Sequence, residues 1–297
     1  MNAKVWSLLI LLSVLWGGSF FFVGVAVQEL PPLIIVTLRV SLAAATLWII
    51  ALLLGHRPPV GSSAWLAFFG MGLLNNVIPF SLIVWGQTQI ASGLASIINA
   101  ATPIFGVIVA GLQLPDEKTT PLKLIGVITG FIGVVVMIGL PALKGDSPLI
   151  AQLAIVGASI SYAFASVWGR RFKAMNISLI MLAAGQVTAS SLVLLPIALY
   201  TAPQGLWTSV NLHTWSAIIA LAVFSTAFAY MIYFKILELA GATNVLLVTL
   251  LVPVSAILLG VTFLGESFKV IHLIGMTLIA LGLSAIDGRI WRRIKKN

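Results

Sequence analysis

The sequence predicts an all-α integral membrane protein with ten transmembrane helices that form two inverted five-helix repeats. Composition is the first reason: of 297 residues, 60% are hydrophobic and 8% are charged, whereas about 25% of a soluble domain is charged. The second reason is a series of ten apolar runs, each close to the roughly 20 residues that cross a bilayer core. The third is that the second half of the chain resembles the first. This composition excludes an ordinary soluble enzyme, a disordered chain and a nucleic-acid-binding domain.

The first apolar run follows Lys4 and covers residues 5–27. It is longer than the apolar segment of a signal peptide, and no small-residue cleavage motif ends it, so we expect a retained first helix. The other runs of the first half are bounded by turn residues such as Pro31-Pro32, Pro58-Pro59 and Pro115-Asp116. They cover residues 33–54, 64–85, 92–114 and 122–141.

The second half contains five more apolar runs. Gly145-Asp146 precedes the first of them, and Gly265-Glu266 separates the last two. The longest connection, at about 200–212, follows the second run. Glycine and acidic residues at these breaks favour turns. The five runs cover residues 149–169, 177–199, 213–235, 242–263 and 270–290.

The basic residues indicate how the helices are oriented. With ten spans, both termini lie on one side of the membrane, and 13 of the 16 Lys and Arg residues fall on that side. The opposite side has only Lys144 and Lys269, and Arg39 lies inside a span. Cytoplasmic loops carry the excess of Lys and Arg, so we expect a plasma-membrane protein with both termini in the cytoplasm. The same bias explains the net charge of +9 without any nucleic acid.

An offset of about 150 residues aligns the two halves. Pro103 aligns with Pro253, Asp116 aligns with Glu266, and the same Leu-Ile-Gly triplet follows both acids. Because each copy has an odd number of spans, the second copy must be inverted in the membrane. Inverted repeats are typical of secondary transporters, in which the two halves alternate the open side. We therefore expect alternating access between two domains, residues 1–145 and 146–297.

Three stretches of the chain carry a family resemblance. They are Leu15-Trp16-Gly17-Gly18-Ser19-Phe20, the segment from Gln87 to Gly139, and the segment from Tyr233 to Gly282 with Leu264-Gly265-Glu266-Ser267. These stretches resemble the ten-helix, EamA-type branch of the drug/metabolite transporter superfamily. One turn departs from the family pattern, because Pro115 stands before Asp116 where the family usually has glycine.

The resemblance implies that helices 1–4 and 6–9 surround a central cavity, with helices 5 and 10 at the periphery. Within the branch, the chain is similar to bacterial exporters of amino acids, aromatic amino acids among them, and of related metabolites. The resemblance therefore implies a bacterial inner-membrane exporter whose partners are a small-molecule substrate and the lipid bilayer. It implies no cofactor, and it leaves the oligomeric state open.

Acidic and histidine side chains are missing from the middle of the predicted spans. All seven Asp and Glu residues and all three His residues lie in loops or near helix ends. Proton relays and cation sites in membranes usually use such residues at depth. The pattern therefore argues against proton-coupled efflux of cationic drugs and favours a uniporter. It also leaves no candidate for a metal site, a haem ligand or an intramembrane protease, so we expect no enzyme. Efflux of drugs or other metabolites, nucleotide-sugar exchange and a channel are the alternatives.

Arg39 is the one charge well inside a span, where insertion costs about 2.5–3.5 kcal/mol. We interpret it either as an anchor for a substrate carboxylate or as a structural residue that binds carbonyl groups or reaches the membrane surface. Pro103 and Pro253 each free a backbone carbonyl in mid-helix and are predicted hinges. The predicted cavity residues lie within spans, and they are Trp16, Asn76, Pro79, Asn99, Tyr162 and Tyr230.

Overall fold

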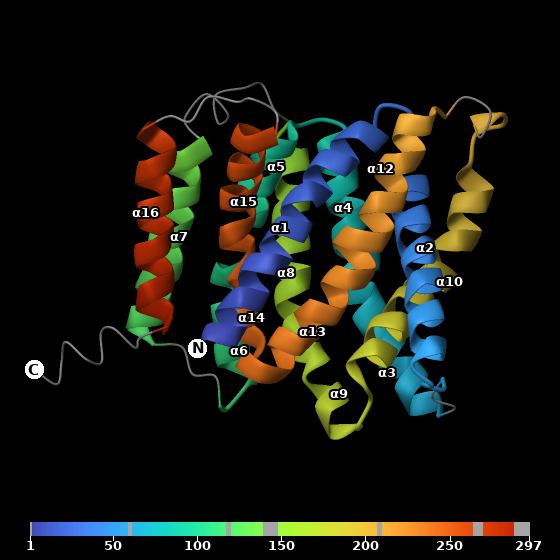
Figure 1. The fold of residues 1–297 in the computed structure, drawn as a ribbon, viewed down its shortest axis with the longest axis horizontal. Helices are drawn as coiled ribbons and strands as arrows, with labels where there is room; N and C mark the ends of the chain where they lie inside the picture. The colour runs from blue at the N-terminus through green and yellow to red at the C-terminus, as the bar shows by residue number, and fades with distance from the viewer. Residues whose placement is uncertain are drawn as a thin grey trace, which may run out of the picture.

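The computed structural model describes residues 2–58, 61–116, 120–138, 148–206, 210–263 and 270–287, and these residues form helices joined by short turns. The long helices stand side by side, with their ends at two opposite faces of the molecule (Figure 1). The start of α1 (Ala3–Ala26) and the end of α16 (Val270–Asp287) lie at the same face. We call this the near face and the opposite one the far face.

Helices occur at all ten predicted positions. Seven helical stretches are long and apolar enough to cross a membrane, and three shorter apolar helices fill the remaining positions. The first half continues with α2 (Pro32–Leu53), α3 (Ser62–Gly72), η1 (Leu73–Val77), α4 (Ile78–Gln87), α5 (Ser92–Asn99), α6 (Thr102–Gln113) and α7 (Pro121–Ile138). The second half, before α16, contains α8 (Leu149–Gly169), α9 (Arg171–Ala174), α10 (Leu179–Thr201), α12 (Leu212–Ala222), η3 (Val223–Phe228), α13 (Ala229–Ala240), α14 (Ala242–Leu246) and α15 (Val248–Phe263). The predicted fold class is confirmed.

Local chemistry sets where the helices start and stop. The side chains of Asn2, Ser178 and Asn211 each accept a hydrogen bond from the backbone N–H three residues later, as helix N-caps do. Pro32 is the first residue of α2, where proline loses no helical bond. Gly241 joins α13 to α14 with a φ of 86°, a conformation that favours glycine. The predicted helix ends at 139–141 and 288–290, the boundary between residues 145 and 146, and Glu266 lie outside the described residues.

The third and eighth spans each contain a π-helical turn at the same place in the repeat. η1 begins at Leu73 and η3 begins at Val223, so the two turns are 150 residues apart, as the sequence offset requires. A π turn shifts the backbone hydrogen bonds by one residue and often marks a functional site. In η3, the hydroxyl of Thr226 also donates to the carbonyl oxygen of Leu221 at 2.8 Å. The π turns therefore repeat along the backbone at the same offset as the matched residues of the sequence.

The first helix of each half packs into the other half. α1 lies against α12, α13 and α15, whereas α8 lies against α4, α5 and α6. One hydrogen bond joins each crossing; the π turn provides the donor in the first, and α8 provides it in the second. Ser225 Oγ donates to the carbonyl oxygen of Leu15 at 2.7 Å, and Ser161 Oγ donates to that of Leu74 at 2.7 Å. The two halves therefore interlock, and polar contacts cross between them at the depth of the π turns.

α7 and α16 pack against each other at one edge of the molecule (Figure 1). Glycines bring the two backbones together: a Cβ on Gly282 would lie 2.4 Å from the carbonyl oxygen of Gly126, and a Cβ on Gly133 would lie 2.7 Å from that of Gly275. Small residues permit such close packing of helices in membranes. The fifth and tenth predicted spans, which are α7 and α16, are thus peripheral, as the resemblance implies.

The two predicted hinge prolines lie in different backbone settings. α5 ends at Asn99, and α6 starts just before Pro103. Pro103 leaves the carbonyl of Asn99 without its helical N–H, and the hydroxyl of Thr102 donates to that carbonyl at 2.5 Å. Pro253 lies inside α15, and the break in its span comes earlier, at Leu247. The hinge role of both prolines stays a prediction.

Candidate functional site

A small cavity lies in the middle of the bundle, with a volume of about 50 Å³. Both halves contribute to its wall, which consists of Trp16, Ser19, Phe20, Val23, Arg39, Phe80, Ile83, Gln87, Asn99, Thr102, Tyr162, Tyr230, Leu246, Thr249 and Val252. Ligand pockets usually measure roughly 300–1,000 Å³, and one water occupies about 30 Å³ in the liquid. This central cavity is therefore small, with room for no more than a few waters. It brings together five predicted site residues, namely Trp16, Arg39, Asn99, Tyr162 and Tyr230.

Arg39 is 5% exposed and points into the bundle. Its Nε donates to Oγ1 of Thr226, in the π turn of the second half, at 2.8 Å. Its guanidinium carbon lies 3.6 Å from the centre of the Phe80 ring. Among the described residues, no carboxylate forms an ion pair with it. Arg39 therefore presents a cation to the central cavity and does not extend to the surface of the bundle.

Two amide oxygens in the cavity wall are unpaired. Asn99 Oδ1 and Gln87 Oε1 are buried and accept no hydrogen bond from any described residue. Each of the two residues is 7% exposed. Buried polar atoms without a partner are uncommon in folded proteins, and both of these belong to side chains that line the central cavity. The described residues therefore leave the acceptor capacity of both oxygens unused.

Asn76 and Pro79 are buried, yet neither is part of the cavity wall. Nδ2 of Asn76 donates to Oγ of Ser190 at 2.8 Å, and its Oδ1 accepts from the hydroxyl of Tyr230. Asn76 is thus turned toward α10 and α13, and it contacts the cavity only through Tyr230. The structure therefore places these two predicted cavity residues beside the cavity and not in its wall.

Gln87 is a wall residue that the sequence-based assignment missed. The predicted span ended at residue 85, whereas α4 continues to Gln87. An error of less than one helical turn was enough to place this side chain in a loop. The sequence did contain an indication of this. Gln87 is a polar residue directly before the turn to the fourth span, where the third and fourth helices must meet.

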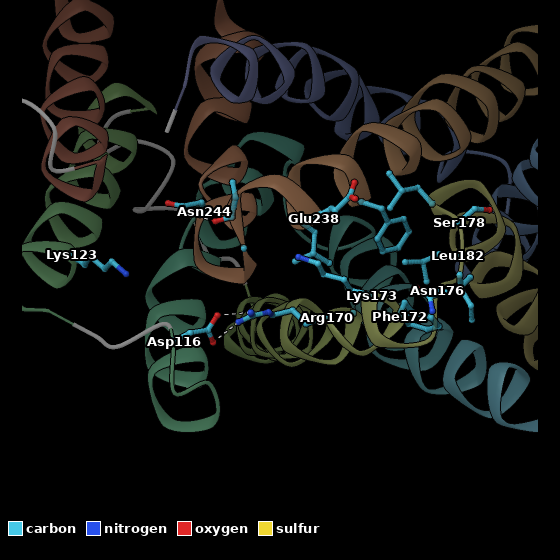
Figure 2. A pocket seen from close by; sticks show the side chains of 17 residues that line it. Asp116, Lys123, Arg170, Phe172, Lys173, Asn176, Ser178, Leu182, Glu238 and Asn244 are labelled. Carbon is cyan, nitrogen blue, oxygen red and sulfur yellow. Dashed lines mark hydrogen bonds and ion pairs between the residues drawn. The ribbon is translucent and has the colours of Figure 1, made fainter.

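A second cavity, of about 740 Å³, opens at the near face (Figure 2), and we call it the near cavity. Asp116 and Arg170 are part of its wall, together with Lys123, Lys173 and Glu238. The guanidinium of Arg170 donates two hydrogen bonds to the Asp116 carboxylate, at 2.8 and 2.5 Å. This ion pair holds the pKa of the Asp116 carboxyl below its usual value. It joins the end of α6 to the end of α8 at the wall of the near cavity.

Aromatic rings lie between the two cavities, which share no wall residue. The ring of Tyr233 is 5.7 Å from that of Trp16 and 6.1 Å from that of Tyr230, both in the central cavity. It is 5.1 Å from the ring of Phe234, which lines the near cavity. Tyr233 is 2% exposed. These rings therefore pack in a continuous aromatic cluster that touches the walls of both cavities.

Comparison with known proteins identifies the family. The EamA-like transporter family matches residues 4–139 and, a second time, residues 149–286. The chain belongs to the EamA-like transporter family. It is therefore a multi-pass membrane transporter of the drug/metabolite transporter superfamily and not an enzyme. The family resemblance inferred from the sequence motifs is confirmed.

Three curated relatives of this EamA-like transporter are similar over nearly the full chain. The inner membrane transporter YedA of Escherichia coli (strain K12) is 30% identical, over 92% of this chain and 87% of YedA. The transporter YoaV of Bacillus subtilis (strain 168) is 25% identical, over 94% and 95% of the two chains. The protein PecM of Dickeya dadantii (strain 3937) is 27% identical, over 95% and 92%. None of these three names states a substrate.

One solved crystal structure has the same fold. It matches the EamA-like transporter with a TM-score of 0.75 over 97% of this chain and 99% of the other, at 20% sequence identity. Coverage of both chains is almost complete, so the shared fold includes both five-helix halves.

Proposed function

We propose that this EamA-like transporter exports neutral or zwitterionic amino acids with aromatic or other hydrophobic side chains, or similar small metabolites, by alternating access. The chemistry of the central cavity carries the proposal: a buried guanidinium shares the cavity with two unpaired amide oxygens. An α-amino acid brings a carboxylate, which pairs with a guanidinium through two hydrogen bonds. It also brings an ammonium with three donors for the amide oxygens.

Aromatic rings in the cavity wall would contact the apolar side chain of such an amino acid. Trp16, Phe80 and Tyr162 line the cavity next to Arg39 and Asn99. Aromatic faces bury apolar side chains and add about 0.5–1.5 kcal/mol when another ring packs against them. An aromatic or aliphatic amino acid would therefore find apolar contacts beside the polar groups.

The charge of the cavity supports a zwitterion over other solutes. Its described wall has one cation, Arg39, and contains no carboxylate and no histidine. A cationic drug would meet a like charge, and a phosphate ester would bring more negative charge than one guanidinium neutralises. An unpaired charge in a dry site is costly. A zwitterion adds no net charge, because its carboxylate is matched by Arg39 and its ammonium by the amide oxygens.

The same wall supports uniport, because the described lining offers no acid or histidine to carry a coupling proton. The near cavity lies at the face to which the sequence pattern assigns most Lys and Arg residues, and we assign this face to the cytoplasm. Since the relative YedA is named an inner membrane transporter, we propose that membrane for this chain, with both termini cytoplasmic. The two repeats, residues 1–145 and 146–297, would then alternate in opening their side of the membrane, with Pro103 and Pro253 as hinges.

Amino-acid analogues that lack one charged group test this assignment. Purified protein in proteoliposomes would take up labelled phenylalanine in competition with phenethylamine, which lacks the carboxylate, or N-acetylphenylalanine, which lacks the ammonium. Each analogue should compete about tenfold less well than phenylalanine, or worse, because each loses a charge-assisted hydrogen bond worth about 1.5–3 kcal/mol. Equal competition by phenethylamine would contradict the role of Arg39. Uptake of other metabolites or drugs, with no competition by any amino acid, would contradict the substrate class.

A further inference from the structure

A polar contact toward the far end of the bundle joins α1 to the turn between α4 and α5. Nε2 of Gln87 donates to the carbonyl oxygen of Phe20 at 3.2 Å and to Oγ of Ser92 at 2.7 Å. The hydroxyl of Ser92 donates to the same carbonyl oxygen at 3.3 Å. A Cβ on Gly24 would lie 2.9 Å from Ser92 Oγ, so α1 approaches the turn closely at a glycine. We call Phe20, Gln87 and Ser92 the far-end latch.

The far-end latch connects elements that belong to different packing units. α1 packs chiefly with α12, α13 and α15 of the second half, whereas Gln87 and Ser92 lie on α4 and α5 of the first half. The two hydrogen bonds to the Phe20 carbonyl therefore cross the boundary that must widen when the far end opens. Gln87 is buried, and burial strengthens these bonds because little water competes for the same donors.

The equivalent place at the near face has different side chains. The 150-residue offset puts Leu237 at the position of Gln87 and Ala242 at that of Ser92. Neither side chain can donate a hydrogen bond. Leu237, together with Gly241 directly before Ala242, instead lines the near cavity of about 740 Å³. The first half thus has a polar contact at the far end. The equivalent turn of the second half, at the near end, has apolar side chains and lies beside an open cavity.

We propose that Gln87 and Ser92 are the gate residues that hold the far end closed while the near cavity is open. The proposal rests on the alternating access of the proposed function, but it concerns which end opens and not which solute passes. When α1 moves away, the carbonyl of Phe20 loses two donors and water takes their place. Each hydrogen bond to the Phe20 carbonyl that a substitution removes therefore shifts the ratio of open to closed far ends by about two- to tenfold.

Spin-label distances test the far-end latch directly. The chain has no cysteine, so Gln28→Cys, just after α1, and Gln89→Cys, in the α4–α5 turn, can carry a nitroxide pair. Both glutamines are exposed. The purified full-length protein in lipid nanodiscs, with no solute added, should show a short far-end distance as its main population. Ser92→Ala and Gln87→Met should raise the ratio of long to short distances about two- to tenfold per hydrogen bond lost, and the double variant should raise it further.

Ser96→Ala is the matched control. Ser96 lies on the same helix as Ser92, and its hydroxyl donates to the carbonyl oxygen of Gly93 within that helix at 2.8 Å, so the distances should not change. Unchanged distances in Ser92→Ala, Gln87→Met and the double variant, all eluting as folded protein, would overturn the gate assignment. Because no solute is present, a failure of amino-acid transport would count against the proposed function alone.

Discussion

Arg39→Met should remove high-affinity transport while the protein stays folded. Methionine keeps much of the apolar length of the side chain. It removes the charge, the hydrogen bond from Nε to Thr226 and the contact with the Phe80 ring. If Arg39 binds the substrate, the variant should lose affinity and keep its stability. If Arg39 is a structural residue, the variant should lose both.

The effects of Arg39→Met on stability largely cancel. The variant loses a charge-assisted hydrogen bond to Thr226, worth about 1.5–3 kcal/mol. It also loses a cation–π contact with Phe80, worth about 2 kcal/mol in a desolvated site. Against these losses, it no longer buries a cation, which costs several kcal/mol per ion. The net change in the free energy of unfolding should therefore stay within about 2 kcal/mol in either direction.

For substrate binding, no gain offsets the loss caused by Arg39→Met. A substrate carboxylate in the cavity would have no guanidinium partner, and the loss of such a partner costs about 2–5 kcal/mol. This corresponds to an affinity that is about 30-fold to several thousand-fold weaker. Thr226→Val is the matched control, because it removes the protein's own hydrogen bond to Arg39 and keeps the charge. Its affinity should stay within about tenfold of the wild type.

Two measurements separate these outcomes. Thermal unfolding is followed by the fluorescence of the nine tryptophans, and affinity is taken from the concentration dependence of phenylalanine uptake into proteoliposomes. We expect a nearly unchanged melting temperature and strongly weakened uptake for Arg39→Met alone. Uptake by Arg39→Met with wild-type affinity would refute the anchor role. Unfolding of both Arg39→Met and Thr226→Val would show that Arg39 is a structural residue.

Three further predictions follow from the geometry. Asn99→Leu removes an unpaired amide oxygen of the cavity and should weaken amino-acid uptake about tenfold without changing the melting temperature; wild-type uptake would make Asn99 a packing residue. Gly282→Val forces side-chain atoms against the α7 backbone and should lower the melting temperature by several degrees, whereas Ala280→Val, at an exposed position of the same helix, should not; equal melting temperatures would contradict the close packing. Because Arg170 lowers the folded pKa of Asp116, the ion pair stabilises the protein above the usual carboxyl pKa and is lost as the pH falls through the lowered one. The difference in melting temperature between wild type and Asp116→Asn should therefore shrink on acidification, and a constant difference would contradict the pairing.

The ten spans and their repeat were predictable because the bilayer fixes the length of each apolar run. The matched Pro103 and Pro253 gave the correct offset, which η1 and η3 repeat in the backbone. The π turns themselves were not predictable, because they depend on a one-residue shift of backbone hydrogen bonds that no residue type dictates. The break at Leu247 likewise does not follow from Pro253, since α15 runs through that proline.

The cavity residues were predictable in part, for a physical reason. A charge or amide deep in a span must find a polar partner or a cavity, and Arg39 and Asn99 line the central cavity. The direction in which a side chain points was harder to infer, because helices such as α1 and α2 are apolar on most sides and show little periodicity. Asn76 therefore binds Ser190 and Tyr230 instead of facing the cavity.

Counterflow in proteoliposomes tests most directly whether the protein is a carrier for zwitterionic amino acids. Vesicles preloaded with unlabelled phenylalanine or threonine receive a trace of the labelled amino acid outside, with no ion or pH gradient. A saturable site that alternates between two faces predicts transient accumulation of label above its equilibrium level. Equilibration without an overshoot would indicate a channel, and accumulation only under an imposed pH gradient would contradict uniport. The absence of flux for every amino acid would contradict the substrate class.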